Sequence, residues 1–205
     1  MTREVTVETQ MSADLSEFVE WGGSAWIEQV EAGVRWLGAL EGLRVLEIGT
    51  RRGGMALYFA TRGAHVTALD ISSETFDGAR ARARDLVVED MVEFREYSGH
   101  LQDLPGGYDV VFAKSTLVLM GDIDPVAKAV TACLAPGGRL LAIENARGPL
   151  LLHAARVIRR RSWRPHGASY FTSASMRAFA AHLDVQLERW TTVPPTVLIG
   201  AARRD

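Results

Sequence analysis

The hydrophobic residues of this chain fall into two patterns that alternate along most of its length. Short apolar runs typical of buried strands lie at 45–48, 64–70, 92–97, 108–114 and 139–144. Between them, apolar residues recur at helical spacing, as at 76–86 and 122–134. Two further runs, 185–190 and 196–201, are predicted to pair as closing strands. Strands that alternate with helices predict an α/β fold built around a parallel sheet.

The first strand runs into a turn rich in glycine. Residues 45–48 are followed by Gly49-Thr50-Arg51-Arg52-Gly53-Gly54, and apolar residues resume at helical spacing from Met55. Glycine allows a positive φ and lets a ligand approach the backbone, and the N–H groups of a helix N-terminus can face that ligand. The acid at the end of the strand, Glu47, borders the opening. The stretch predicts a cofactor site that includes Glu47, Gly49, Thr50, Arg51 and Gly53.

The second strand ends in an acid, Asp70, followed by Ile71. A carboxylate at this position can accept hydrogen bonds from both ribose hydroxyls of a nucleoside. This holds for a dinucleotide and for S-adenosylmethionine alike. The turn distinguishes them, because a dinucleotide fingerprint has the pattern G-x-G-x-x-G and Arg51 stands at its second glycine. An NAD-type oxidoreductase is therefore the less favoured alternative.

Three motifs resemble those of the class I S-adenosylmethionine-dependent methyltransferases. The stretch V-L-E-I-G-T-R-R-G-G is similar to the family's first motif, with Arg51 at the middle glycine. Asp70 matches the second motif, and residues 134–141 are similar to the L-x-P-G-G-x-L turn before the fifth strand. The resemblance spans roughly residues 40–205. It implies a Rossmann-like three-layer sandwich, a seven-stranded, mostly parallel sheet with an antiparallel last strand, and an N-terminal helical lid. It also implies S-adenosylmethionine as cofactor and S-adenosylhomocysteine as product.

The segment 98–105 is similar to the family's G-D-A-x-D-L-P segment. In the family, the acid after the glycine commonly receives the adenine amino group, and the next backbone N–H meets a ring nitrogen. The resemblance transfers these roles to His100 and Leu101. An imidazole can accept one hydrogen bond or stack on a purine. The alternative for His100 is an exposed loop histidine without a ligand.

The fourth strand ends at Lys114 and is followed by Ser115 and Thr116. Its end faces the reaction centre if the fold is of this type. No N/D-P-P-Y/F motif follows, which argues against the amide and adenine N-methyltransferases that use one. No carboxylate follows either, and Mg²⁺-dependent catechol-type enzymes need clustered acids there, so we expect no catalytic metal. We assign Lys114 to the cofactor site and Ser115 to the substrate site. Lys114 as a ligand for an anionic acceptor and Lys114 as a strand-end charge both stay open.

The remaining candidates lie outside the cofactor core. Residues 14–40 contain an aromatic stripe that includes Trp21 and Trp26. This stripe either packs on the sheet or forms a lid over cofactor and acceptor, hinged at Gly22 and Gly23. An oxygen acceptor of high pKa needs a general base; His153 is the first candidate and His166 and Tyr170 are weaker ones, whereas a carboxylic acid acceptor would need no base. Trp21, Trp26 and Tyr170 are assigned to the substrate site.

Composition and charge limit the class of protein. The chain has 205 residues and a net charge of −2, so no overall positive field attracts nucleic acid. Its single cysteine, Cys133, excludes an intrachain disulfide and is predicted to be buried. The absence of a signal-like start and of a membrane-length apolar run predicts a cytoplasmic protein without stable membrane insertion.

We interpret the chain as one methyltransferase domain, 1–205, acting on a small molecule and transferring the methyl group to an oxygen atom of a secondary metabolite or metabolic intermediate. Its expected parts are an N-terminal helical lid, a cofactor-binding core, an acceptor-side insert, and a closing helix with strands: 1–40, 41–145, 146–172 and 173–205. A non-catalytic S-adenosylmethionine-binding partner subunit is the main alternative. Three points are left open: which acceptor is used, whether the protein forms a homodimer, and whether the arginines at 156–161 bind substrate, lipid or only solvent.

Overall fold

The structure is a computed structural model that describes residues 15–20, 23–145, 178–179, 181, 185–193 and 196–203. The α-helices with defined bounds in the described residues are α2 (Ser24–Leu37), α3 (Gly54–Thr61), α4 (Phe76–Asp85) and α5 (Ile123–Cys133), and residues 15–18 are also helical. The strands are β1 (Arg44–Ile48), β2 (His65–Asp70), β3 (Val92–Glu96), β4 (Tyr108–Lys114), β5 (Leu134–Asn145), β6 (Val185–Val193) and β7 (Thr196–Arg203). Short 3₁₀ turns occur at Glu89–Met91, Leu101–Asp103 and Leu117–Leu119.

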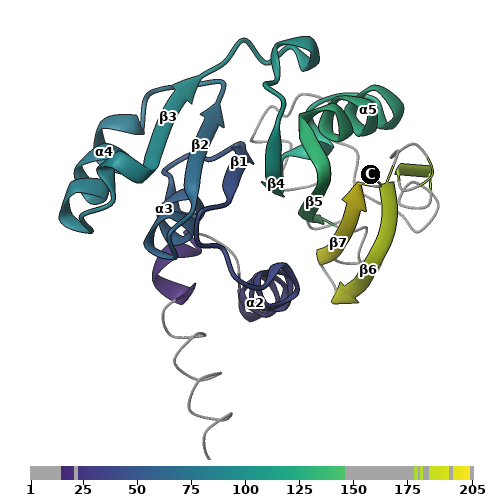
Figure 1. The fold of residues 1–205 in the computed structure, drawn as a ribbon, viewed down its shortest axis with the longest axis horizontal. Helices are drawn as coiled ribbons and strands as arrows, with labels where there is room; N and C mark the ends of the chain where they lie inside the picture. Colours follow the sequence, from purple (N-terminus) through teal and green to yellow (C-terminus); the bar gives the residue numbers. More distant parts are fainter. Residues whose placement is uncertain are drawn as a thin grey trace, which may run out of the picture.

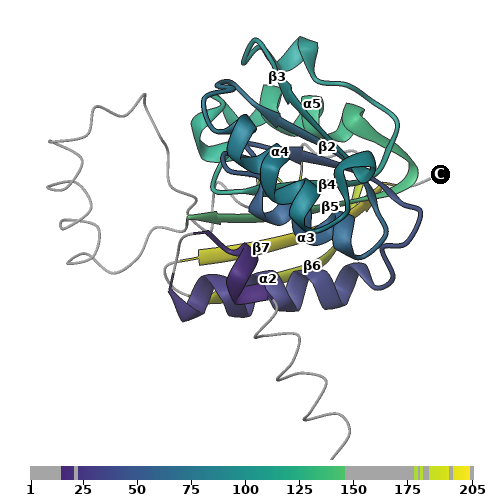
Figure 2. The same ribbon diagram turned by 90° about the vertical axis from the view of Figure 1, so that its left-hand side faces the viewer.

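The seven strands form one sheet in the order β3-β2-β1-β4-β5-β7-β6 (Figure 1). β7 is antiparallel to both of its neighbours, whereas β1 to β5 pair in parallel. The helices α2, α3 and α4 lie against one face and α5 against the other (Figures 1 and 2). This arrangement confirms the predicted α/β, Rossmann-like, mostly parallel fold with an antiparallel last strand.

The strand order reverses at β1, which lies between β2 and β4. Ile48 near the end of β1 is paired with Leu69 of β2 and with Ala113 of β4. The carboxyl ends of the three strands therefore lie level with one another. In open α/β sheets, ligands bind in the crevice at such a switch point, so this edge is where the site must be sought.

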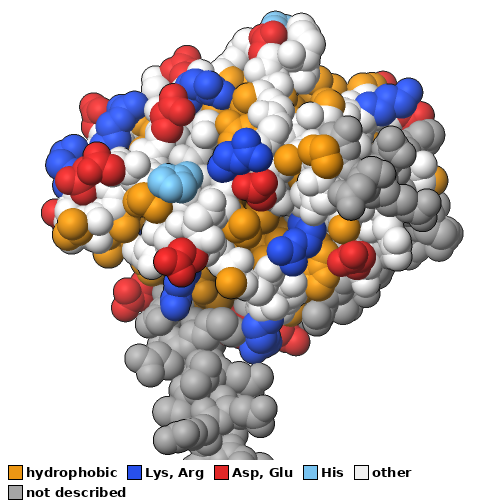
Figure 3. All heavy atoms as spheres, in the orientation of Figure 1, with side chains coloured by type: hydrophobic (Ala, Val, Ile, Leu, Met, Phe, Trp, Pro, Cys, Tyr) orange, Lys and Arg blue, Asp and Glu red, His pale blue; other side chains and the backbone are white. Residues whose placement is uncertain are grey.

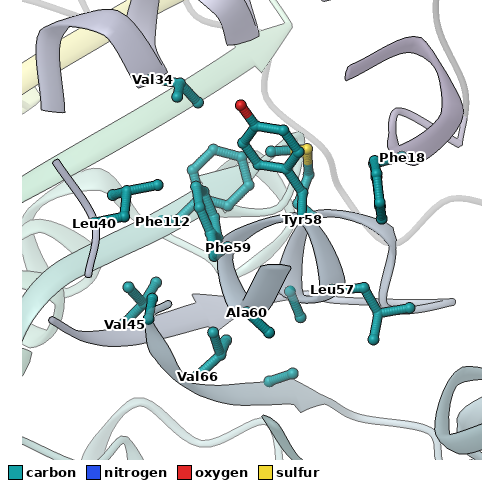
Figure 4. Close-up of a cluster of buried hydrophobic side chains, with 14 of the residues drawn as sticks. Phe18, Val34, Leu40, Val45, Leu57, Tyr58, Phe59, Ala60, Val66 and Phe112 are labelled. Carbon is teal, nitrogen blue, oxygen red and sulfur yellow. The ribbon is translucent and has the colours of Figure 1, made fainter. Parts of the chain in front are cut away.

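Aromatic side chains fill the core beneath α3 (Figure 4). Phe59 of α3 meets Phe112 of β4 edge-to-face, with 5.0 Å between ring centres, and both rings are fully buried. Such aromatic pairs contribute about 0.5–1.5 kcal/mol beyond the apolar area they bury. On the other face, Cys133, the last residue of α5, is buried in the core, which confirms its predicted role as a core residue. The site therefore rests on a rigid, tightly packed base.

α2 is a core helix. It lies across β5 and β7, and a Cβ on Gly33 would come within 2.6 Å of Leu141 on β5, so the helix packs unusually close to the sheet. Trp26 on this helix is only 5% exposed. Of the two interpretations of the aromatic stripe, packing on the sheet holds for α2. Whether residues 1–40 also act as a lid stays a prediction.

The largest error among the predicted boundaries is at the start of the fifth strand, whereas β6 and β7 extend two or three residues beyond their predicted ends. The fifth strand was expected to begin at Arg139, but β5 begins at Leu134, which already pairs with Tyr108 of β4. The register then shifts between Tyr108 and Val110, and Gly137 adopts a φ of 69°. The Pro-Gly-Gly segment thus forms an irregular start of the strand, which a glycine at positive φ permits.

Several predicted site residues lie outside the described residues, namely Trp21, His153, His166, Tyr170 and the arginines at 156–161. The acceptor-side insert at 146–172 also lies outside them. Among the described helices, none is long and apolar enough to cross a membrane.

Candidate active site

The glycine turn after β1 depends on glycine for two separate reasons. Gly49 has a φ of 81°, and a Cβ there would lie 2.1 Å from the hydroxyl oxygen of Thr116. Gly53 also has a φ of 81°, and its Cβ would lie 2.6 Å from the ring of Phe94. At both positions the backbone has a conformation that residues with a side chain rarely adopt. Neighbouring side chains also leave no room for a Cβ there.

Arg51 adopts the same left-handed conformation without being glycine, with a φ of 53°. This conformation costs a non-glycine residue about 1–2 kcal/mol. Two hydrogen bonds hold it in place: the Arg51 N–H donates to Asp70 Oδ2 at 2.7 Å, and the Thr75 hydroxyl donates to the Arg51 carbonyl. The turn therefore keeps its shape although the middle glycine of the motif is missing.

Asp70 and three further predicted cofactor residues lie around the end of β2. Ile71 is 65% exposed, and a Cβ on Gly99 would lie 3.3 Å from its side chain, so the loop carrying His100 and Leu101 runs beside it. The His100 N–H donates to the Ser98 hydroxyl at 3.0 Å, which fixes the loop, while the residue itself is exposed. The structure thus brings Asp70, Ile71, His100 and Leu101 to one edge.

Glu47 at the end of β1 is 4% exposed. Its Oε2 accepts a hydrogen bond of 2.7 Å from the Thr50 hydroxyl. Burial raises the pKa of this carboxyl to about 7, opposed by the Thr50 hydrogen bond and reinforced by the nearby Glu20. A group with such a pKa changes its charge near neutral pH.

Lys114 at the end of β4 reaches into the same space. Its Nζ lies 5.4 Å from the centre of the Trp26 ring, which places Trp26 of α2 beside the cluster of charges. Burial lowers the pKa of Lys114 to about 8, opposed by the charges of Glu47 and Glu20. The ammonium thus lies over the Trp26 ring and is stabilised by the charges of the two carboxylates.

Sequence analysis missed Glu20 as a site residue. Its Oε1 accepts a hydrogen bond of 3.1 Å from the Gly54 N–H, at the first residue of α3. The two residues are separated by 34 positions, and no motif links them. Only the tertiary structure shows that this carboxylate lies in the site.

The end of β4 is held by the end of β5. Ser115 has a φ of 57°, and its hydroxyl accepts a hydrogen bond from the Asn145 side-chain amide. Glu144 is fully buried, and its Oε1 accepts the N–H groups of Thr116 at 3.0 Å and Leu117 at 2.9 Å. Burial raises the pKa of Glu144 to about 8. Ser115, the predicted substrate residue, is therefore fixed in a strained conformation at the carboxyl edge.

A cavity of about 820 Å³ lies at the opposite, amino edge of the sheet, where its lining includes Arg44, His65, Val92 and Tyr108. Ligands of parallel α/β sheets bind at the carboxyl edge. We therefore place the site among the charged and glycine residues of the carboxyl edge and not in this cavity.

In the part of the chain that the structure describes, no group of three or more His, Cys, Asp or Glu residues is placed to hold a metal ion. The expectation that catalysis needs no metal stays a prediction.

A family model matches the central part of the chain. Residues 46–140 match the family model of a methyltransferase domain, and this range contains the glycine turn, Asp70, His100 and Lys114. Most of the residues that form the site therefore lie in a stretch that is similar to methyltransferase domains. This match agrees with the family resemblance of the three motifs.

Two curated relatives are ubiquinone biosynthesis O-methyltransferases. The one from Aeromonas salmonicida is 34% identical over 112 residues, which are 55% of this chain and 47% of the relative. The one from Xanthomonas euvesicatoria pv. vesicatoria is 30% identical over 161 residues, which are 73% of this chain and 65% of the relative. The chain thus spans about half the length of the first of these relatives.

Among solved structures, the magnesium protoporphyrin IX methyltransferase of Synechocystis PCC 6803, with bound S-adenosylhomocysteine, has a TM-score of 0.66. The match covers 92% of this chain and 91% of that one, at 20% sequence identity. This likeness shows a shared fold.

Proposed function

We propose that the protein binds S-adenosylmethionine and transfers its methyl group to an oxygen atom of a small molecule. The observation that supports this most directly is the position of Asp70. Its half-buried carboxylate stands at the end of β2, hydrogen-bonded to the backbone of the glycine turn at Arg51. A carboxylate in this position can accept hydrogen bonds from two ribose hydroxyls while the turn shapes the space beside it.

The described residues divide the proposed cofactor site into two ends. Asp70, Ile71, His100 and Leu101 would hold the ribose and adenine. Glu47 and Lys114, together with the glycine turn, would hold the other end near the switch point. When bound, S-adenosylmethionine supplies a methyl group activated by its own sulfonium charge, so the protein mainly aligns the acceptor for an in-line displacement.

The acceptor side is proposed on a different basis. The names of the two curated relatives, both O-methyltransferases, support an oxygen acceptor. We keep Ser115 and Trp26 as substrate residues, since Ser115 presents a hydroxyl at the carboxyl edge and Trp26 lies beside Lys114. His153 as general base and Trp21 and Tyr170 as substrate residues stay proposals from sequence.

The partners are proposed as follows. The acceptor is a small molecule. The protein binds no nucleic acid and does not insert stably into a membrane, and whether it forms a homodimer is left open. On the face shown in Figure 3, acidic and basic side chains are intermixed and form no extended basic patch, which supports the exclusion of nucleic acid. A cytoplasmic location also stays a proposal.

The test is formation of S-adenosylhomocysteine from S-adenosylmethionine in the presence of a panel of small phenols and hydroxy acids. The wild type should form product with at least one acceptor. Asp70→Asn should be much less active, whereas Asp77→Asn, which removes the same charge from the exposed side of α4, should not. Binding of S-adenosylmethionine without turnover on any acceptor would favour the non-catalytic partner subunit.

A further inference from the structure

Residues 15–20 form a strap that crosses the start of α3. A Cβ on Gly54, the first residue of that helix, would lie 2.1 Å from the carbonyl oxygen of Phe18 and 2.8 Å from Cγ of Glu20. The strap therefore lies directly on the backbone that follows the glycine turn. Only a residue without a side chain fits beneath it.

Specific contacts hold the strap in this position. Leu15 and Phe18 are buried, and the ring of Phe18 meets Tyr58 of α3 edge-to-face at 5.6 Å (Figure 4). Arg82 of α4 also lies over that ring, 4.8 Å from its centre, and donates a hydrogen bond of 2.9 Å to the carbonyl of Glu17. The strap is thus fixed to two helices, and the carboxylate of Glu20 has a defined place.

That place is the start of α3. The Glu20 carboxylate accepts a hydrogen bond from the backbone N–H of Gly54, and the N–H groups of Gly54 and Arg52 both lower its pKa against the effect of burial. A helix N-terminus favours a negative charge. A carboxylate has room for about four hydrogen bonds, so these contacts leave Glu20 able to accept from a ligand as well.

The charges around Glu20 are unequal. Two carboxylates, Glu20 and Glu47, share a partly enclosed space with the ammonium of Lys114, and Arg51 stands at its exposed side. Burial is the largest influence on the pKa of Glu20, Glu47 and Lys114, and in each case it disfavours the charged form. The two buried or half-buried carboxylates would therefore gain from an additional positive charge.

We propose that Glu20 recognises the ammonium group at the amino-acid end of the sulfonium cofactor, together with Glu47, while Lys114 faces the carboxylate of the same end. This rests on the proposed function. The strap then supplies a specificity-determining residue that selects a ligand bearing an α-amino group. The glycine turn and Asp70 select the nucleoside independently of it.

The test compares three ligands by calorimetry: S-adenosylmethionine, S-adenosylhomocysteine and methylthioadenosine, which lacks the amino-acid end. Glu20→Gln keeps an oxygen for the Gly54 N–H but loses the charge. It should weaken binding of the first two ligands at least about tenfold, as expected for a lost charged hydrogen bond, and leave methylthioadenosine unchanged. Glu17→Gln removes the same charge from an exposed position on the strap and should change none of the three affinities.

An equal loss for all three ligands would overturn the proposal, because a merely structural role of Glu20 does not distinguish them. Unchanged affinities would overturn it too, although binding of S-adenosylmethionine by the wild type would still support the proposed function. Should Glu20→Gln fail to fold, the wild type gives a second test. Decarboxylated S-adenosylhomocysteine, which keeps the ammonium group and is a thioether like methylthioadenosine, should bind at least about tenfold tighter than methylthioadenosine, and equal affinities would overturn the proposal.

Discussion

Replacing Glu144 by glutamine should change how the stability of the protein depends on pH. Glu144 is fully buried, its Oε1 accepts two backbone N–H groups, and its Oε2 has no partner among the described residues. Its pKa is raised to about 8 by burial, so the folded protein keeps the proton that the unfolded chain releases near its ordinary pKa. The folded state therefore binds more protons, and its stability falls as pH rises from about 4.5 to about 8.

The size of this loss follows from the shift. Each pKa unit corresponds to about 1.4 kcal/mol, so Glu144 would cost at most about 5 kcal/mol of stability by pH 8 relative to pH 4. Glutamine has the shape of the protonated acid and keeps an acceptor for the N–H groups of Thr116 and Leu117. Glu144→Gln should therefore match the wild type near pH 5 and exceed it in stability at pH 8.

Urea unfolding at pH 5, 6, 7 and 8 measures this difference. Other titrating groups act equally in both proteins, so the difference in the free energy of unfolding isolates Glu144. Glu144→Leu serves as control, since it leaves two N–H groups without acceptors and should be less stable than Glu144→Gln at every pH, by about 1–3 kcal/mol per group. A Glu144→Gln difference that stays constant with pH would refute the reasoning.

Three further changes test the site. Arg51→Gly should stabilise the fold by about 1 kcal/mol in urea unfolding, because the left-handed backbone then has no side-chain penalty; a loss would contradict this. Gly49→Ala places a Cβ against Thr116 and should lower the free energy of unfolding by more than about 2 kcal/mol. It should also weaken cofactor binding; urea unfolding and calorimetry measure the two effects. Affinity for S-adenosylmethionine should rise about fivefold from pH 6 to pH 7.5 as Glu47 deprotonates toward the ammonium group, before Lys114 loses its proton near pH 8; methylthioadenosine should show no such rise.

The features set by short stretches of sequence, such as strand bounds and the glycine turn, could be predicted. The strand at 108–114 has the predicted bounds, and the glycine turn and the acid ending β2 lie together as expected, because βαβ geometry brings the ends of neighbouring parallel strands to one edge. The match of Asp70 to the family's second motif therefore sufficed to place it beside Arg51.

Long-range contacts could not be predicted in this way. Glu20 reaches Gly54 across 34 positions, and Glu144 reaches Leu117 across 27. The spacing of hydrophobic residues does not indicate which carboxylate will contact the start of which helix. The aromatic spacing around Trp26 was likewise consistent with both a core helix and a lid, since both bury one face. Only the close approach of Gly33 to Leu141 decided in favour of the core for α2.

The most direct test of the central claim is a calorimetric titration of S-adenosylmethionine and NAD⁺ into the wild type, Asp70→Asn and Asp77→Asn. The account predicts micromolar binding of S-adenosylmethionine to the wild type and to Asp77→Asn, strongly weakened in Asp70→Asn, with no comparable binding of NAD⁺. Absence of S-adenosylmethionine binding, preference for NAD⁺, or full affinity in Asp70→Asn would contradict it.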